Sequence, residues 1–164
     1  MVWQRRTILT GFCGLLAFRG TPLQADTSAQ TLLHVVPLDG PGLALDRAAL
    51  EALPQVSFDT TTIWTEGRIA FRGPRLHDVL AAAGITKGRI LLKALNDYEV
   101  EMGLEELGED WPIIATRQNG QPFDVRDQGP LWLVFPYDEK IAISPERMHT
   151  LSVWQLVQVQ ELAP

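Results

Sequence analysis

Cysteine is almost absent from this sequence of 164 residues, since Cys13 is the only one. One cysteine forms no disulfide within the chain, and it does not supply the paired thiolates of a structural zinc site. The three histidines, His34, His77 and His149, are too far apart to make a metal-binding motif. The serines and histidines also lack the spacing typical of a nucleophilic hydrolase. The sequence therefore offers no motif for zinc-dependent or nucleophilic catalysis.

Positive charge is scarce as well, with 14 Lys and Arg residues against 20 Asp and Glu and a formal net charge of -6. This acidic balance argues against binding to nucleic acid or to an anionic membrane surface. No run beyond residue 20 reaches the roughly 18 apolar residues of a membrane-spanning helix. Internal repeats and a glycine-rich phosphate-binding loop are also lacking. The length suits one domain with a sizeable core.

The first 25 residues have a different character from the rest. Arg5 and Arg6 precede an apolar stretch over residues 8–18, and Ala25 is a small residue at a suitable distance behind it. This order predicts a secretory signal peptide over residues 1–25, cleaved near Ala25. The paired arginines also resemble a twin-arginine signal, and general secretion fits equally well. The alternative to cleavage is an uncleaved membrane anchor.

Cleavage would leave a single domain over residues 26–164, located in the periplasm or secreted. It would remove three arginines and no acidic residue, so 11 basic and 20 acidic residues would remain, with a formal net charge of -9. Cys13 would be lost too. The mature chain would then have no disulfide and no thiolate for a metal.

Strand patterns outnumber helix patterns in this domain, which predicts an α+β fold. Asp46 is placed to cap a short helix that stops at Pro54, and a second, amphipathic helix is expected from Pro74 until Gly84. Asn119-Gly120 predicts a tight hairpin turn, and Ser144-Pro145 opens a short helical turn. Strands are expected over residues 32–37, 56–64, 68–72, 89–95, 98–102, 111–116, 121–125, 131–135 and 153–159.

The segment Arg126-Asp127-Gln128-Gly129-Pro130 precedes the apolar strand 131–135. Loops carried on rigid strands often hold binding residues, so Arg126 and Asp127 are candidates for the lip of a ligand site. The alternative is that the two side chains only pair with each other at a surface turn.

Four short motifs follow one another along the chain: Phe71-Arg72-Gly73-Pro74-Arg75-Leu76-His77-Asp78-Val79-Leu80 with Ala81-Ala82-Ala83-Gly84, Ala94-Leu95-Asn96-Asp97-Tyr98, Asn119-Gly120-Gln121-Pro122 and Gln128-Gly129-Pro130-Leu131. In order and spacing they resemble the molybdopterin-binding domain of the sulfite oxidase family, over roughly residues 56–159. The likeness is closest to small, secreted, single-domain members that share the run at residues 126–132 and a late Trp154-Gln155-Leu156. The resemblance implies a sulfite oxidase-like molybdopterin-binding fold and a pocket for a pterin.

One departure from the family bears on chemistry. Family enzymes hold molybdenum through a cysteine upstream of the segment matching Phe71-Arg72-Gly73, and here that region reads Thr60-Thr61-Thr62-Ile63-Trp64-Thr65. A threonine hydroxyl is too hard a ligand, and its pKa is too high, to replace a soft thiolate. We therefore expect a pterin or molybdopterin-type ligand without molybdenum.

A pterin is a flat bicycle with an amino edge and a carbonyl edge, so it needs aromatic faces and polar partners. The candidate faces are Trp64, Tyr98, Trp132 and Trp154, each of which has the alternative role of a plain core residue. Asn96 and Asp127 are candidates for the amino edge. Arg72 and Arg126 are candidates for the carbonyl edge.

The resemblance then implies an exported pterin-binding protein that acts as a ligand-dependent partner of a membrane-bound signalling protein. One alternative is a molybdopterin-dependent oxidoreductase of the sulfite oxidase family. A second alternative is an interaction module without a ligand.

Overall fold

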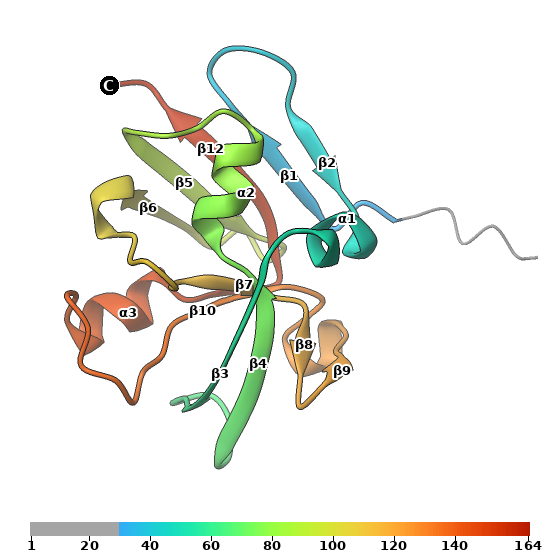
Figure 1. The fold of residues 1–164 in the computed structure, drawn as a ribbon, viewed down its shortest axis with the longest axis vertical. Coiled ribbons are helices and arrows are strands. Elements are labelled where there is room, and N and C mark those ends of the chain that lie inside the picture. Colours follow the sequence, from blue (N-terminus) through green and yellow to red (C-terminus); the bar gives the residue numbers. More distant parts are fainter. Residues whose placement is uncertain (1–29) are drawn as a thin grey trace, which may run out of the picture.

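The structure is a computed structural model and describes residues 30–164 (Figure 1). The expected signal peptide and its cleavage point lie outside the described residues. Within the described part, no helix has the length and apolar character needed to cross a membrane.

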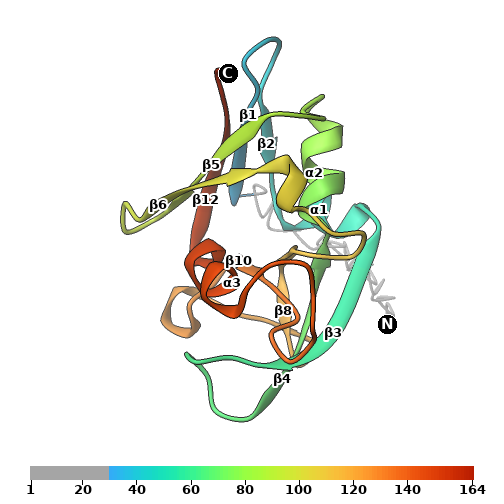
Figure 2. The same cartoon turned by 90° about the vertical axis from the view of Figure 1, so that its left-hand side faces the viewer.

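A five-stranded sheet and the helix α2 (Leu76–Ala82) form one end of the molecule (Figures 1 and 2). Across this sheet the strands are β2 (Leu43–Leu45), β1 (Leu33–Val36), β12 (Leu156–Leu162), β5 (Arg89–Ala94) and β6 (Glu99–Gly103). β1 and β12 run parallel, and the other neighbours are antiparallel. The sheet and the helix share the main hydrophobic core, in which Leu76 and Leu80 join Leu92 and Val159.

Two smaller sheets form the other end. One contains β3 (Gln55–Thr61), β4 (Arg68–Pro74), β8 (Arg117–Gln118) and β9 (Gln121–Pro122), and the other contains β11 (Val153–Trp154), β10 (Trp132–Val134) and β7 (Ile113–Ala115). Gly73 on β4 lies directly against the backbone of Ile114 on β7, where a side chain would clash. This close approach packs the two small sheets together around a second core that includes Phe71 and Trp132.

The chain passes between two sheets at Gln155. This residue adopts a left-handed backbone conformation with φ of 54°. Trp154 before it pairs with Trp132 in the three-stranded sheet, whereas Leu156 after it pairs with Ala94 in the five-stranded sheet. The strand expected over residues 153–159 is therefore two strands, and Trp154 lies where the two sheets meet.

Local sequence signals set most element boundaries correctly. The Asp46 side chain accepts a hydrogen bond from the Ala49 amide at 2.7 Å, which caps α1 (Arg47–Ala52) as predicted. Ser144 caps α3 (Pro145–Leu151) in the same way. Asn119 and Gly120 both have positive φ in the predicted hairpin turn.

Three predicted boundaries were wrong. The strand expected over residues 56–64 ends at Thr61, so Trp64 lies in the β3–β4 turn. The helix expected from Pro74 begins at Leu76, because Pro74 still belongs to β4. The strand expected over residues 121–125 ends at Pro122, and a short 3₁₀ helix, Val125–Asp127, follows it.

Candidate functional site

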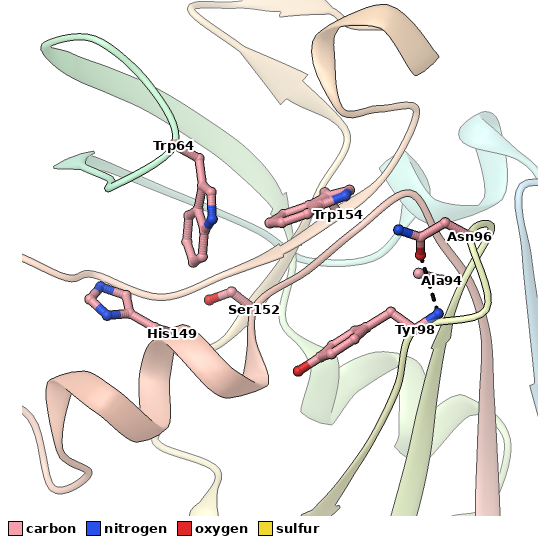
Figure 3. Close-up of a pocket in the computed structure, with 7 residues that line it drawn as sticks. All are labelled: Trp64, Ala94, Asn96, Tyr98, His149, Ser152 and Trp154. Atoms are coloured by element: carbon pink, nitrogen blue, oxygen red, sulfur yellow. Dashed lines mark hydrogen bonds between the residues drawn. The ribbon is translucent and has the colours of Figure 1, made fainter.

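A pocket of about 190 Å³ lies where the three sheets and α3 come together. Trp64 comes from the β3–β4 turn, Trp154 from β11, and the rest from the β5–β6 hairpin and the region of α3 (Figure 3). Its lining residues are Trp64, Ala94, Asn96, Tyr98, His149, Ser152 and Trp154. Aromatic rings therefore make most of the wall, and no arginine, lysine, aspartate or glutamate is among the lining residues.

Trp64 is the centre of the aromatic wall. Its ring centroid lies 5.5 Å from those of Trp154 and His149, in edge-to-face geometry at 70° and 85°. Behind it the ring of Trp132 lies 5.9 Å away. Edge-to-face pairs of this kind contribute about 0.5–1.5 kcal/mol each beyond area burial, so the rings of the wall stabilise one another's positions.

The β3–β4 turn that carries Trp64 is held by threonine side chains. The hydroxyl of Thr62 accepts a hydrogen bond from the Trp64 amide at 3.0 Å and contacts the hydroxyl of Thr65 at 2.8 Å. Such side chain–backbone bonds stabilise turns. The threonine-rich sequence around Trp64 thus fixes the position of the tryptophan.

Small side chains leave room between two aromatic rings. In Figure 3 the rings of Trp154 and Tyr98 lie above and below the space beside Ser152 and Ala94. Ser152 is 4% exposed, whereas Tyr98 is 43% exposed at the mouth. This arrangement suits a flat ligand that stacks on a ring and reaches a polar group at the bottom.

Helix α3 is clamped to the five-stranded sheet beside the pocket. Nε and Nη2 of Arg147 each donate to the Glu106 carboxylate at 2.7 Å, and Nη2 also donates to the Glu101 carbonyl at 3.0 Å. The hydrogen bond from Arg147 lowers the pKa of Glu106 below its ordinary value, and the Gly103 amide adds to this effect. The clamp holds the helix that brings His149 and Ser152 to the pocket.

The structure brings together four of the eight residues predicted from the sequence. Trp64, Asn96, Tyr98 and Trp154 all line the pocket. Trp132 lies directly behind two of them, and it is fully buried. Trp132 therefore supports the wall and does not present a free face.

The charged residues predicted for the site lie elsewhere. Arg72 alternates with the buried Phe71 on β4, so it faces outward, with its Cα opposite that of Arg117 on β8. Arg126 and Asp127 are exposed on the 3₁₀ helix, and they form no ion pair with each other. Arg72, Arg126 and Asp127 therefore do not line this pocket.

Sequence reasoning missed His149 and Ser152. Neither belongs to a motif, and His149 reaches the pocket only because α3 packs beside the β3–β4 turn. The one local signal was Ser144-Pro145, which predicted the helix without indicating the face that it presents.

The donor set of the described residues does not fit molybdenum. These residues contain no cysteine, and among them no group of three or more His, Asp or Glu side chains is placed to hold a metal ion. The pocket also lacks the arginines that usually bind phosphate. An uncharged aromatic ring fits it better.

No protein-family model matches the sequence, and no curated protein matches it either. Among solved structures, the sulfane dehydrogenase SoxCD from Paracoccus pantotrophus is similar, with a TM-score of 0.60 and 14% sequence identity. The match covers 82% of this chain and 39% of that chain, so this chain spans well under half the length of its neighbour. At this identity the likeness is one of fold. It confirms that the chain has the α+β, sulfite oxidase-like fold that its motifs predicted.

Proposed function

We propose that this chain is an exported pterin-binding protein that works by binding and not by catalysis. The observation that carries the proposal is the pocket in which Trp64, Trp154 and Tyr98 surround a space with small side chains at its base. Most ligand sites are largely pre-formed and apolar, with few polar groups that orient the ligand. A pterin ring has the flat shape that this pocket accepts.

The turn that carries Trp64 supports this reading. The sequence resemblance places the family's molybdenum-binding cysteine in the region of residues 60–65, and in this chain that region contributes a tryptophan face to the pocket. A thiolate there would bind a metal, whereas an indole offers only stacking and one N–H donor. A tryptophan in this region in place of a cysteine favours recognition of the organic ring without a metal.

The volume of the pocket and the charge of its lining limit which pterins fit. Pockets for drug-sized molecules usually measure about 300–1,000 Å³, and this one is about 190 Å³. With no basic side chain in the lining except His149, the pocket favours a pterin without a phosphate tail over complete molybdopterin. The proposed ligand is therefore a small, uncharged pterin.

The proposed role is that of a regulatory partner of a membrane-bound signalling protein in the periplasm. A protein without a catalytic group passes on a signal when its ligand changes the stability or shape of a surface. A ligand here would contact residues from the β3–β4 turn, the β5–β6 hairpin, α3 and β11 at once. Export rests on the signal peptide expected over residues 1–25.

Pterin binding is tested by titration of the purified mature protein with tetrahydrobiopterin and with oxidised pterin, followed by pterin fluorescence and calorimetry. Tetramethylammonium is the comparison ligand, because aromatic boxes also attract organic cations. Trp154→Ala should weaken pterin binding by about tenfold, since stacking contributes about 0.5–1.5 kcal/mol and buried ring area adds to it. Ile63→Ala is the matched control, because Ile63 is 68% exposed on the same turn as Trp64. No pterin binding by the wild type would overturn the proposal.

The second candidate is a molybdopterin-dependent oxidoreductase, which is favoured by the fold shared with the sulfane dehydrogenase SoxCD. In this case another chain or an unusual ligand would have to hold the metal, because the described residues contain no thiolate. Metal analysis of protein from its native periplasm separates the two candidates. About one molybdenum per chain, together with turnover of an oxo-acceptor substrate, would favour the enzyme.

A further inference from the structure

We infer that Ser152 and Tyr98 act as hydrogen-bond acceptors for the ligand, so that the pocket selects a ring bearing an amino group on the edge that enters it. This inference rests on the proposed function and specifies which pterins the site takes. It follows from where the protons of the two hydroxyl groups point.

The proton of the Ser152 hydroxyl is already committed. Its Oγ donates to the Met148 carbonyl at 2.7 Å, and a carbonyl oxygen only accepts. The same Oγ contacts the hydroxyl of Tyr137 at 2.5 Å, so Tyr137 must be the donor in that pair. Burial raises the pKa of Tyr137 to about 12, which keeps this donor protonated at neutral pH. Towards the pocket, Ser152 therefore offers a lone pair and no proton.

The proton of the Tyr98 hydroxyl is also used in a hydrogen bond within the protein. Its hydroxyl donates to the Thr150 carbonyl at 2.8 Å, which leaves the phenol oxygen as an acceptor. The Asn96 side chain provides the opposite character, because its Oδ1 accepts from the Tyr98 amide at 3.2 Å and its amide N–H groups remain available. In Figure 3 the nitrogen of Asn96 points toward Trp154, on the side of the pocket away from the Ser152 hydroxyl.

The pocket thus has acceptors near α3 and a donor at the β5–β6 hairpin, with aromatic faces between them. A ring that presents an amino group to Ser152 and Tyr98 offers one N–H group to each of the two oxygens. A ring that presents a carbonyl there places two acceptors against each other and leaves a buried oxygen without a proton. The 2-amino group of a pterin meets the requirement. Lumazine has the same bicycle but carries an oxo group at that position, between two ring N–H groups, so it presents a carbonyl where a pterin presents the amino group.

The test compares pterin with lumazine in the full mature protein, by calorimetry or fluorescence titration. The wild type should bind pterin at least about tenfold more tightly than lumazine, the ratio expected when one buried hydrogen bond is lost. Tyr98→Phe removes one acceptor at a half-exposed position that tolerates the change. It should reduce this ratio.

The decisive variant removes Ser152 without leaving a buried donor behind. In Ser152→Ala alone the Tyr137 hydroxyl would lose its acceptor. The double variant Ser152→Ala with Tyr137→Phe is therefore compared with Tyr137→Phe alone, so that the Tyr137 hydroxyl is absent from both. The double variant should lose most of the remaining preference for pterin, and Ile63→Ala should keep all of it.

The outcomes separate the two levels of the argument. If the wild type binds neither pterin nor lumazine, the proposed function fails and this inference fails with it. If the wild type binds both equally, or the double variant and Tyr98→Phe keep the full preference, the function stands and the acceptor role of these residues is refuted.

Discussion

The Arg147–Glu106 pair makes part of the protein's stability dependent on pH. It holds α3 against the end of β6, and both nitrogen–oxygen distances are 2.7 Å. We expect Glu106→Gln to lower the free energy of unfolding at neutral pH, because a neutral amide leaves the Arg147 guanidinium without its charged partner.

The magnitude follows from the geometry. Hydrogen bonds to charged groups contribute about 1.5–3 kcal/mol when buried. Here the side chains of Arg147 and Glu106 are 36% and 21% exposed, so solvent screening reduces the gain. We expect a loss of about 1–2 kcal/mol, which would lower the melting temperature by roughly 2–8 °C for a chain of this size.

The pH dependence has a definite sign. The pKa of Glu106 is lowered in the folded protein from its ordinary value of 4.5, so the folded state favours the ionised carboxylate. The stabilisation is therefore fully present above pH 4.5 and is lost as the pH falls through the folded-state pKa. Other carboxylates with lowered pKa, such as Glu51 and Asp138, also destabilise the protein in acid. Only the difference between wild type and Glu106→Gln isolates this pair.

The assay is urea unfolding followed by tryptophan fluorescence, at pH values from 7 down to 3. Glu105→Gln is the control, because Glu105 is the exposed neighbour and forms no ion pair in the described structure. The difference between wild type and Glu106→Gln should be constant near pH 7 and should shrink below about pH 4.5. A difference that is absent at pH 7, or that stays the same down to pH 3, would refute the reasoning.

Three further predictions concern the site and the mature chain. Asp127→Ala should leave pterin affinity unchanged in a fluorescence titration, because Asp127 lies outside the pocket; a tenfold loss would return the 3₁₀ helix to the site. Trp64→Ala should weaken pterin binding by at least about tenfold and lower the melting temperature, because Trp64 also packs against Trp132 and Trp154. Thiol titration of the denatured exported protein should find no cysteine, and one thiol per chain would show that Cys13 is retained.

Much of the fold was predictable because its signals are local. The Asp46 cap, the Asn119-Gly120 turn and the apolar spacing of α2 each depend on residues that are neighbours in the sequence. The outward direction of the Arg72 side chain was also predictable from the sequence, since side chains alternate along a strand and the neighbouring Phe71 is apolar. This alternation indicates that Arg72 faces away from the core that Phe71 enters.

The part of the site that the sequence did not predict depends on contacts between distant segments. His149 and Ser152 reach the pocket because α3 is tied to Glu101 and Glu106, more than 40 residues earlier in the chain. No pattern within α3 indicates that contact, and Met148 and Leu151 show only which face is buried. Long-range packing of this kind is not encoded in a local spacing of residue types.

The segment around Arg126 and Asp127 does not line the pocket, and the hydrogen bonds of Gln155 connect it to the residue next to Trp154. Its side chain donates to the Val125 carbonyl at 2.9 Å, its amide donates to the Gln128 carbonyl at 3.1 Å, and its own carbonyl accepts from the Leu95 amide at 2.9 Å. These bonds join residues 125–128 and the β5–β6 hairpin to the residue that follows Trp154. The segment therefore supports the aromatic wall through its backbone, while its charged side chains stay in solvent. A sequence motif at such a position can indicate a segment that supports the site through its backbone as readily as one whose side chains bind the ligand. Both roles depend on the same backbone conformation.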